Sequence, residues 1–165
     1  MDILFSDKEY IFSHRVGGIL IQNGKILLQK PKNDDYAIIG GHVNLFETTE
    51  NALRREFKEE LHTEIEIDNL MAIGEVFFPW GKKPCHQISL YYKIHLSDEN
   101  ALSKNEIISG FDCLDNKKIT LDFCWIPIKE LKNITVYPKE ITPIILKNST
   151  GTEHFVSNQL GQNSF

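Results

Sequence analysis

The stretch GGHVNLFETTENALRREFKEELHTEI, residues 40–65, carries the strongest structural signal in this chain. Within it, Leu53, Phe57 and Leu61 recur at every fourth position, which is the spacing of an apolar stripe along one side of an α-helix. Thr48 or Thr49 stands where a side-chain oxygen can cap the first turn. The stretch therefore predicts an amphipathic helix over residues 48–61.

The predicted helix also places three carboxylates on one face. At about 100° per residue, Glu59 lies at about −60° and Glu60 at about +40° from Glu56, beside the apolar stripe. Like charges at these spacings cost about 0.2–0.5 kcal/mol per pair and raise one another's pKa. A hard divalent cation such as Mg²⁺, which prefers oxygen ligands, reverses both effects. The alternative is a solvated charged helix whose basic residues neutralise the acids.

Residues next to the helix favour a ligand site. Gly40 and Gly41 follow a short apolar run, and paired glycines let the backbone approach a ligand closely. Glu47 lies just before the helix, and Arg55 can hold a carboxylate through two parallel hydrogen bonds.

This pattern resembles the signature of the Nudix hydrolases, which runs from a glycine through a glutamate to Arg-Glu and Glu-Glu pairs. Gly41, Glu47 and the run from Arg55 to Glu60 fall in register with every charged position of that signature. Two positions depart from it, since His62 replaces the last glycine and Thr63 the apolar residue after it. A glycine there normally supplies a left-handed cap, so the departure concerns the cap geometry more than the chemistry.

Outside the helix the chain reads mostly as strands. Asn23-Gly24 between two apolar runs predicts a hairpin, and residues 71–78, 86–96 and 121–128 are rich in branched and aromatic side chains. Residues 79–84 are expected to form a loop, and residues 97–118 form a long polar segment. Short helices near residues 129–131 and 138–147 and an edge strand over residues 154–158 complete the prediction. The mixture lacks a βαβ rhythm and indicates an α+β (mixed α/β) fold.

The resemblance covers about residues 12–145 and implies the Nudix fold, an α/β/α sandwich with a mixed central sheet, as one domain over residues 1–165. It implies a Mg²⁺-dependent pyrophosphohydrolase, with Mn²⁺ able to substitute, that cleaves a nucleoside diphosphate linked to another group. Glu59 and Glu60 would be the principal metal ligands. Glu56 would be a further ligand or the base that orients water, and the carbonyl of Gly40 would complete the shell.

The resemblance also implies supporting roles for other residues. Arg55, with Glu47 as its partner, would orient the carboxylates, and an acid from a later loop would assist, for which Glu106 is favoured. Phe78 and Trp80 are candidates for stacking on a base, although aromatic side chains in a loop more often pack structurally. Arg15 is a candidate phosphate contact, with a surface role as the alternative.

Composition limits the partners. Net charge is −5, with mostly lysine among the basic residues, which argues against a stable nucleic-acid partner. Three scattered cysteines predict neither a disulfide framework nor a zinc site. The absence of a signal-like or membrane-spanning apolar run predicts a cytoplasmic protein with no membrane partner. A nucleotide-type small molecule is the expected substrate and a homodimer is possible. The rival hypotheses are a non-catalytic nucleotide sensor and a chance match in an unrelated protein.

Overall fold

The computed structural model describes residues 1–103, 107–114, 117–148 and 150–161, without the side chains of residues 110–120. Within these ranges no helix is long and apolar enough to cross a membrane. The elements are β1 (Leu4–Ser6), β2 (Ile11–Gln22), β3 (Lys25–Lys30), β4 (Tyr36–Ala37), β5 (Ile39–His42), α1 (Thr49–Leu61), β6 (Ile65–Trp80), β7 (Lys83–Leu96), β8 (Ile107–Leu114), β9 (Lys117–Pro127), the 3₁₀-helix η1 (Ile128–Asn133), β10 (Val136–Tyr137), α2 (Ile141–Lys147) and β11 (Glu153–Asn158).

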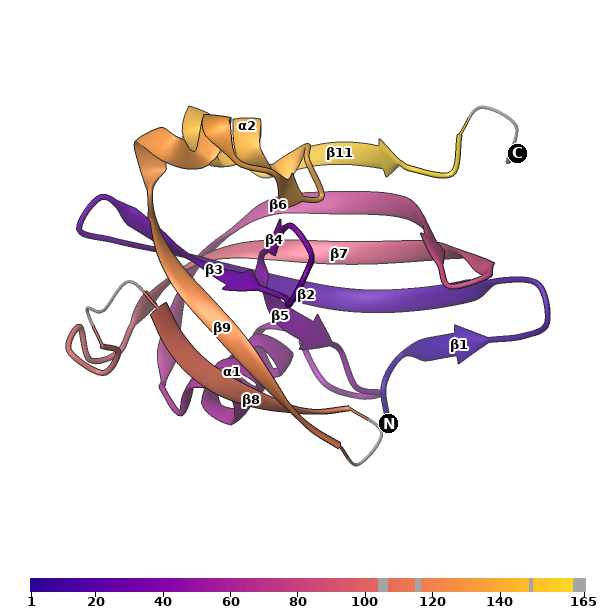
Figure 1. Cartoon of the computed structure of the whole chain (residues 1–165), viewed down its shortest axis with the longest axis horizontal. Helices are drawn as coiled ribbons and strands as arrows, with labels where there is room; N and C mark the ends of the chain where they lie inside the picture. The colour runs from indigo at the N-terminus through magenta and orange to yellow at the C-terminus, as the bar shows by residue number, and fades with distance from the viewer. Residues whose placement is uncertain (104–106, 115–116, 149, 162–165) are drawn as a thin grey trace.

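The strands form a mixed sheet around β2 (Figure 1). β2 runs parallel to β7 and antiparallel to β5, while β6 is antiparallel to β7 and β11 is parallel to β6. At its far end β2 turns through Asn23 and Gly24, both with positive φ, into β3, which pairs with β9. The predicted Asn-Gly hairpin is confirmed.

Apolar residues on successive positions of the strands belong to two separate clusters. Leu20 and Tyr92 pack with the α1 residues Leu53 and Phe57, whereas Ile19 and Tyr91 pack with α2 residues such as Ile141. Because neighbouring strand residues point to opposite faces, the two helices cover opposite faces of the sheet. The predicted mixed α/β sandwich is confirmed.

Helix α1 begins and ends where the sequence indicates. Thr48 is its N-cap, and its hydroxyl accepts a hydrogen bond from the backbone N–H of Asn51 at 3.3 Å. His62 takes the left-handed cap conformation at φ 53° and ψ 36°, and its N–H donates to the Phe57 carbonyl. A histidine adopts this region less readily than glycine but more readily than most residues, so the cap survives the departure from the signature.

Two segments differ from the sequence expectation. Residues 79–84 are almost entirely strand, since β6 and β7 pair as far as Trp80 and Lys83 and only Gly81 and Lys82 form the turn. The positive φ of Gly81 makes so tight a turn possible. The polar segment over residues 97–118 contains β8, which is paired with β9. The favoured late acid, Glu106, lies outside the described residues.

Candidate active site

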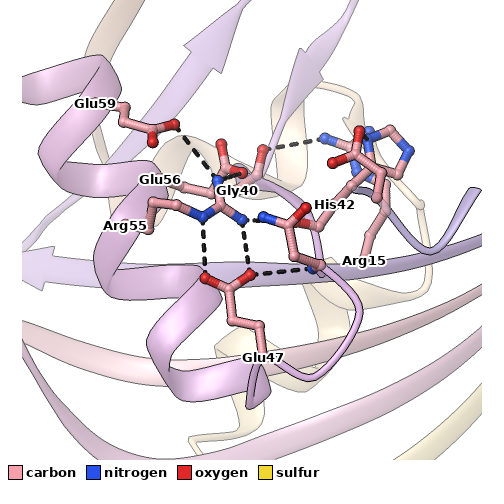
Figure 2. A network of polar contacts seen from close by, with 9 residues as sticks. Arg15, Gly40, His42, Glu47, Arg55, Glu56 and Glu59 are labelled. Atoms are coloured by element: carbon pink, nitrogen blue, oxygen red, sulfur yellow. Dashed lines mark hydrogen bonds and ion pairs between the residues drawn. The ribbon is translucent and has the colours of Figure 1, made fainter.

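Arg55 is the centre of a polar network that joins α1 to the loop before it (Figure 2). Its Nε and Nη2 each donate to a different carboxylate oxygen of Glu47 at 3.0 Å, and Nη2 also donates to the His42 carbonyl at 2.9 Å. The hydrogen bonds from Arg55 lower the pKa of Glu47, helped by a further bond from the Asn44 N–H. This forked pairing fixes the loop over residues 42–47 against the helix.

The same guanidinium reaches the glutamates of the helix. Nη1 of Arg55 donates to Glu56 at 2.6 Å and to Glu59 at 3.4 Å. The Glu56 side chain is 14% exposed and that of Glu59 is 60% exposed. Burial raises the pKa of Glu56 and outweighs the opposing effect of Arg55. Glu60 is buried on the helix side that carries Leu53 and Phe57. The three glutamates thus occupy a gradient from buried to solvent-exposed.

Gly41 is required by the position of Glu56. A Cβ added at Gly41 would lie 2.2 Å from the carboxylate carbon of Glu56 and 2.3–2.4 Å from its two oxygens. The backbone of Gly41 and the Glu56 carboxylate are therefore in direct contact, in a space that any side chain on Gly41 would fill. Next to this contact, Nη2 of Arg15 donates to the Gly40 carbonyl at 3.0 Å.

The donor atoms in this cradle suit a hard cation. Across the described ranges, no three His, Cys, Asp or Glu side chains converge closely enough to hold a metal ion as they stand. The atoms that accept hydrogen bonds from Arg55 Nη1 and Arg15 Nη2 here include oxygens of Glu56 and Glu59 and the Gly40 carbonyl, and Mg²⁺ prefers oxygen ligands. Two arginines donate to these three atoms, which are three of the four ligand positions predicted for the metal, whereas the fourth, Glu60, is buried. The residues fit such an ion by donor chemistry.

His42, next to Gly41, carries an aromatic contact. Its ring stacks on Trp80 at 6.2 Å between ring centroids, and Trp80 in turn stacks on Phe78 at 6.0 Å. Burial, reinforced by Arg15, lowers the pKa of His42 against the opposing effect of Asp2. The predicted aromatic pair is therefore linked, through the His42 ring, to the strand that carries Gly41.

A pocket of about 690 Å³ opens next to Arg15. Arg15 and Phe78 line it, as do Gln87, Ser89 and Tyr137. The structure thus brings two of the predicted substrate residues to one cavity, whereas Trp80 is not part of its lining. Sequence reasoning missed Gln87 and Ser89. Their signal is the alternation of polar residues within the otherwise apolar strand over residues 86–96.

Comparison with known proteins gives one family match and several similar folds. Residues 12–145 match the family model described as NUDIX domain. An ADP-ribose pyrophosphatase from Streptococcus suis is similar over 87% of this chain and 98% of its own, at TM-score 0.57 and 15% identity. The MutT protein of Bacillus halodurans matches over 89% and 91% at TM-score 0.56 and 15% identity. A MutT NUDIX hydrolase from Burkholderia pseudomallei matches over 84% and 98% at TM-score 0.51 and 22% identity.

Proposed function

Since the chain belongs to the NUDIX domain family, we propose that this Nudix hydrolase is a Mg²⁺-dependent pyrophosphohydrolase acting on a nucleoside diphosphate linked to another group. The observation that carries the proposal is the contact between the Glu56 carboxylate and the Gly41 backbone, with Arg55 donating a hydrogen bond to the same carboxylate. This contact places the carboxylate oxygens of Glu56 where a metal ion bound to them could also contact a diphosphate. Residues 1–165 would act as one hydrolase domain.

The carboxylates of the site would bind the metal ion that the substrate requires. A diphosphate is densely negative and cannot bind an acidic cluster unaided, so a bound Mg²⁺, held by Glu56, Glu59, Glu60 and the Gly40 carbonyl, would neutralise charge and lower the pKa of water. Mn²⁺ would substitute. Most of the remaining catalysis is positioning and electrostatics.

Arginine and glutamate side chains would position the reacting groups. Arg55, fixed by Glu47 and the His42 carbonyl, orients the Glu56 carboxylate. Glu56, whose pKa is raised by burial, either holds the ion or accepts a proton from the attacking water. Water forms the new P–O bond, and the bond to the leaving phosphate oxygen breaks. Arg15, the arginine next to Gly40, would contact a phosphate oxygen of the substrate.

The similar proteins suggest the substrate class but do not select a member of it. One is named an ADP-ribose pyrophosphatase and two are MutT proteins, so nucleotide sugars such as ADP-ribose and nucleoside triphosphates are both substrates to test. The pocket beside Arg15 gives room for the non-phosphate part of either.

The deciding experiment measures phosphate release, with an added phosphatase to reveal monophosphate products. The panel contains nucleoside triphosphates, ADP-ribose, nucleotide sugars and dinucleoside polyphosphates, each with Mg²⁺, with Mn²⁺ and with EDTA. We expect metal-dependent cleavage of one class. If no compound in the panel is cleaved although nucleotide still binds, the proposal of an enzyme would give way to that of a non-catalytic nucleotide sensor.

Variants then assign the metal ligands. Glu59→Gln and Glu60→Gln keep the side-chain shape and remove the charge, so turnover should fall by orders of magnitude while the fold survives. Glu50→Gln is the matched control, because Glu50 lies on the same helix but pairs with Arg54 at 3.4 Å, outside the network of Arg55. A fully active Glu59→Gln/Glu60→Gln double variant would refute the ligand assignment.

A further inference from the structure

One face of the sheet is polar where a structural core would be apolar. Of the six buried polar or charged residues among the described side chains, four are on this face: Ser13, Gln87, Ser89 and Ser157. They are neighbours across strands, because Ser13 pairs in register with Gln87, and Val76 pairs with both Gln87 and Ser157. Burying hydroxyl and amide groups costs free energy unless they find partners, so a face built only for packing would carry apolar residues here.

Hydrogen bonds hold the Gln87 amide in one orientation. Ser13 Oγ donates to Gln87 Oε1 at 3.5 Å, and Gln87 Nε2 donates to Ser89 Oγ at 2.9 Å. A primary amide offers two N–H donors and two acceptor lone pairs. The serines use one of each, which leaves Gln87 one donor and one acceptor for a further group. Gln87 and Ser89 both line the 690 Å³ pocket.

The rest of the pocket favours a flat, uncharged occupant. Phe78 comes from β6, Tyr137 comes from β10, which pairs with β4, and Pro138 directly follows β10. Among the described lining residues the charged ones are Arg15 and Asp34. Because Arg15 also donates to the Gly40 carbonyl, the pocket adjoins the acidic cluster at the point where a phosphate would lie.

We propose that Gln87 is a specificity-determining residue that reads the edge of the substrate's nucleobase with its side-chain amide, held in register by Ser13 and Ser89. A glutamine amide can pair with a base edge that presents an adjacent donor and acceptor. The proposal rests on the proposed function, since it assigns the part of the same substrate that is not cleaved.

Binding without turnover tests the proposal separately from catalysis. In EDTA, ¹⁵N-labelled protein is titrated with the 5′-monophosphates of adenosine, guanosine, cytidine and uridine. Ribose 5-phosphate and glucose 1-phosphate serve as ligands without a base. The Gln87 side-chain NH₂ resonance, assigned by its proximity to Ser89, should shift with at least one nucleotide and stay unchanged with both sugar phosphates.

Substitutions provide the second measurement. Gln87→Met keeps the volume and removes both hydrogen-bonding atoms, so the affinity for the preferred nucleotide should fall about 10- to 100-fold, as expected for one bidentate base contact. Affinity for ribose 5-phosphate should not change. Gln22→Met is the matched control, since Gln22 lies on β2 outside this pocket and donates to the Glu99 carbonyl.

Three results would overturn the proposal: an amide resonance that no nucleotide shifts, a ribose 5-phosphate affinity equal to that of every nucleotide, or Gln87→Met binding that matches the wild type. If Gln87→Met fails to fold, the wild-type titration decides alone. Base binding without metal-dependent turnover would refute the enzyme and keep the role of Gln87. Metal-dependent turnover, combined with no effect of nucleotides on the Gln87 resonance and none of Gln87→Met on binding, would support the enzyme and refute the role of Gln87.

Discussion

Gly41→Ala is the substitution whose effect follows most directly from the geometry. The added Cβ would lie 2.2 Å from the Glu56 carboxylate carbon, whereas ordinary contacts begin at 3.4 Å, so that carbon must retreat by about 1.2 Å. Among the nearest atoms the obstacle is the end of a side chain and not backbone. We therefore expect the fold to persist and the Glu56 side chain to move.

The displacement has two costs of different kinds. Glu56 loses its 2.6 Å contact with Arg55 while its side chain, 14% exposed, stays largely shielded. Overpacking and the weakened charged hydrogen bond together cost about 1–3 kcal/mol of the free energy of unfolding. For activity, a misplacement of about 1 Å at the reacting centre can cost about 100-fold in rate, and we expect Gly41→Ala to lose at least that.

A double-mutant cycle isolates the contact. Urea unfolding is measured for the wild type, Gly41→Ala, Glu56→Ala and the double variant, because stability does not require an active enzyme. With Glu56 shortened, the alanine methyl has room, so Gly41→Ala should cost almost nothing in that background. Equal costs in both backgrounds, or a fully active Gly41→Ala enzyme, would refute the reasoning.

Two further predictions concern groups with shifted pKa values. Arg55 lowers the pKa of Glu47, so the pair stabilises the fold above the ordinary glutamate value of 4.5 and this stabilisation is lost as the pH falls through the folded pKa. In urea unfolding, Glu47→Gln should be less stable than the wild type at pH 7 by about 1–3 kcal/mol, with a smaller gap at pH 3, and a gap independent of pH would contradict the pairing. Burial raises the pKa of Cys85 to about 11, so iodoacetamide should label it far more slowly in the native protein than in urea when read by peptide mass spectrometry; equal rates would contradict its burial.

Local spacing was sufficient to predict the helix and its acidic cluster. The stripe of Leu53 and Phe57 depends on residues a few positions apart and is observed, and of the two predicted cap candidates, Thr48 and Thr49, Thr48 is the N-cap. The Arg55–Glu47 pair that the resemblance implies is also formed, because a separation of eight positions covers the end of one loop and about two helical turns.

The pocket depends on contacts that spacing cannot supply. Ser13 and Gln87 are 74 positions apart and meet only because β2 and β7 run parallel in register. In its local sequence, Gln87 looks like one polar residue of an ordinary strand. Likewise, the sequence does not reveal that Arg15 reaches the carbonyl of Gly40, since that contact requires the pairing of β2 with β5.

The charge balance explains how a helix can carry neighbouring glutamates. Arg55 alone meets three carboxylates, those of Glu47, Glu56 and Glu59, so one positive charge serves three negative ones. Glu60 adds a fourth carboxylate on the same helix, and Arg15 adds a second guanidinium at Gly40. With every group ionised, the cluster retains two uncompensated negative charges, which is the charge that one divalent cation balances. Burial raises the pKa of Glu56, and protonating Glu56 would remove half of this charge imbalance. Arginine neutralisation and the proposed cation binding are therefore not competing explanations of this helix: the first orders the carboxylates, and the second would balance their remaining charge.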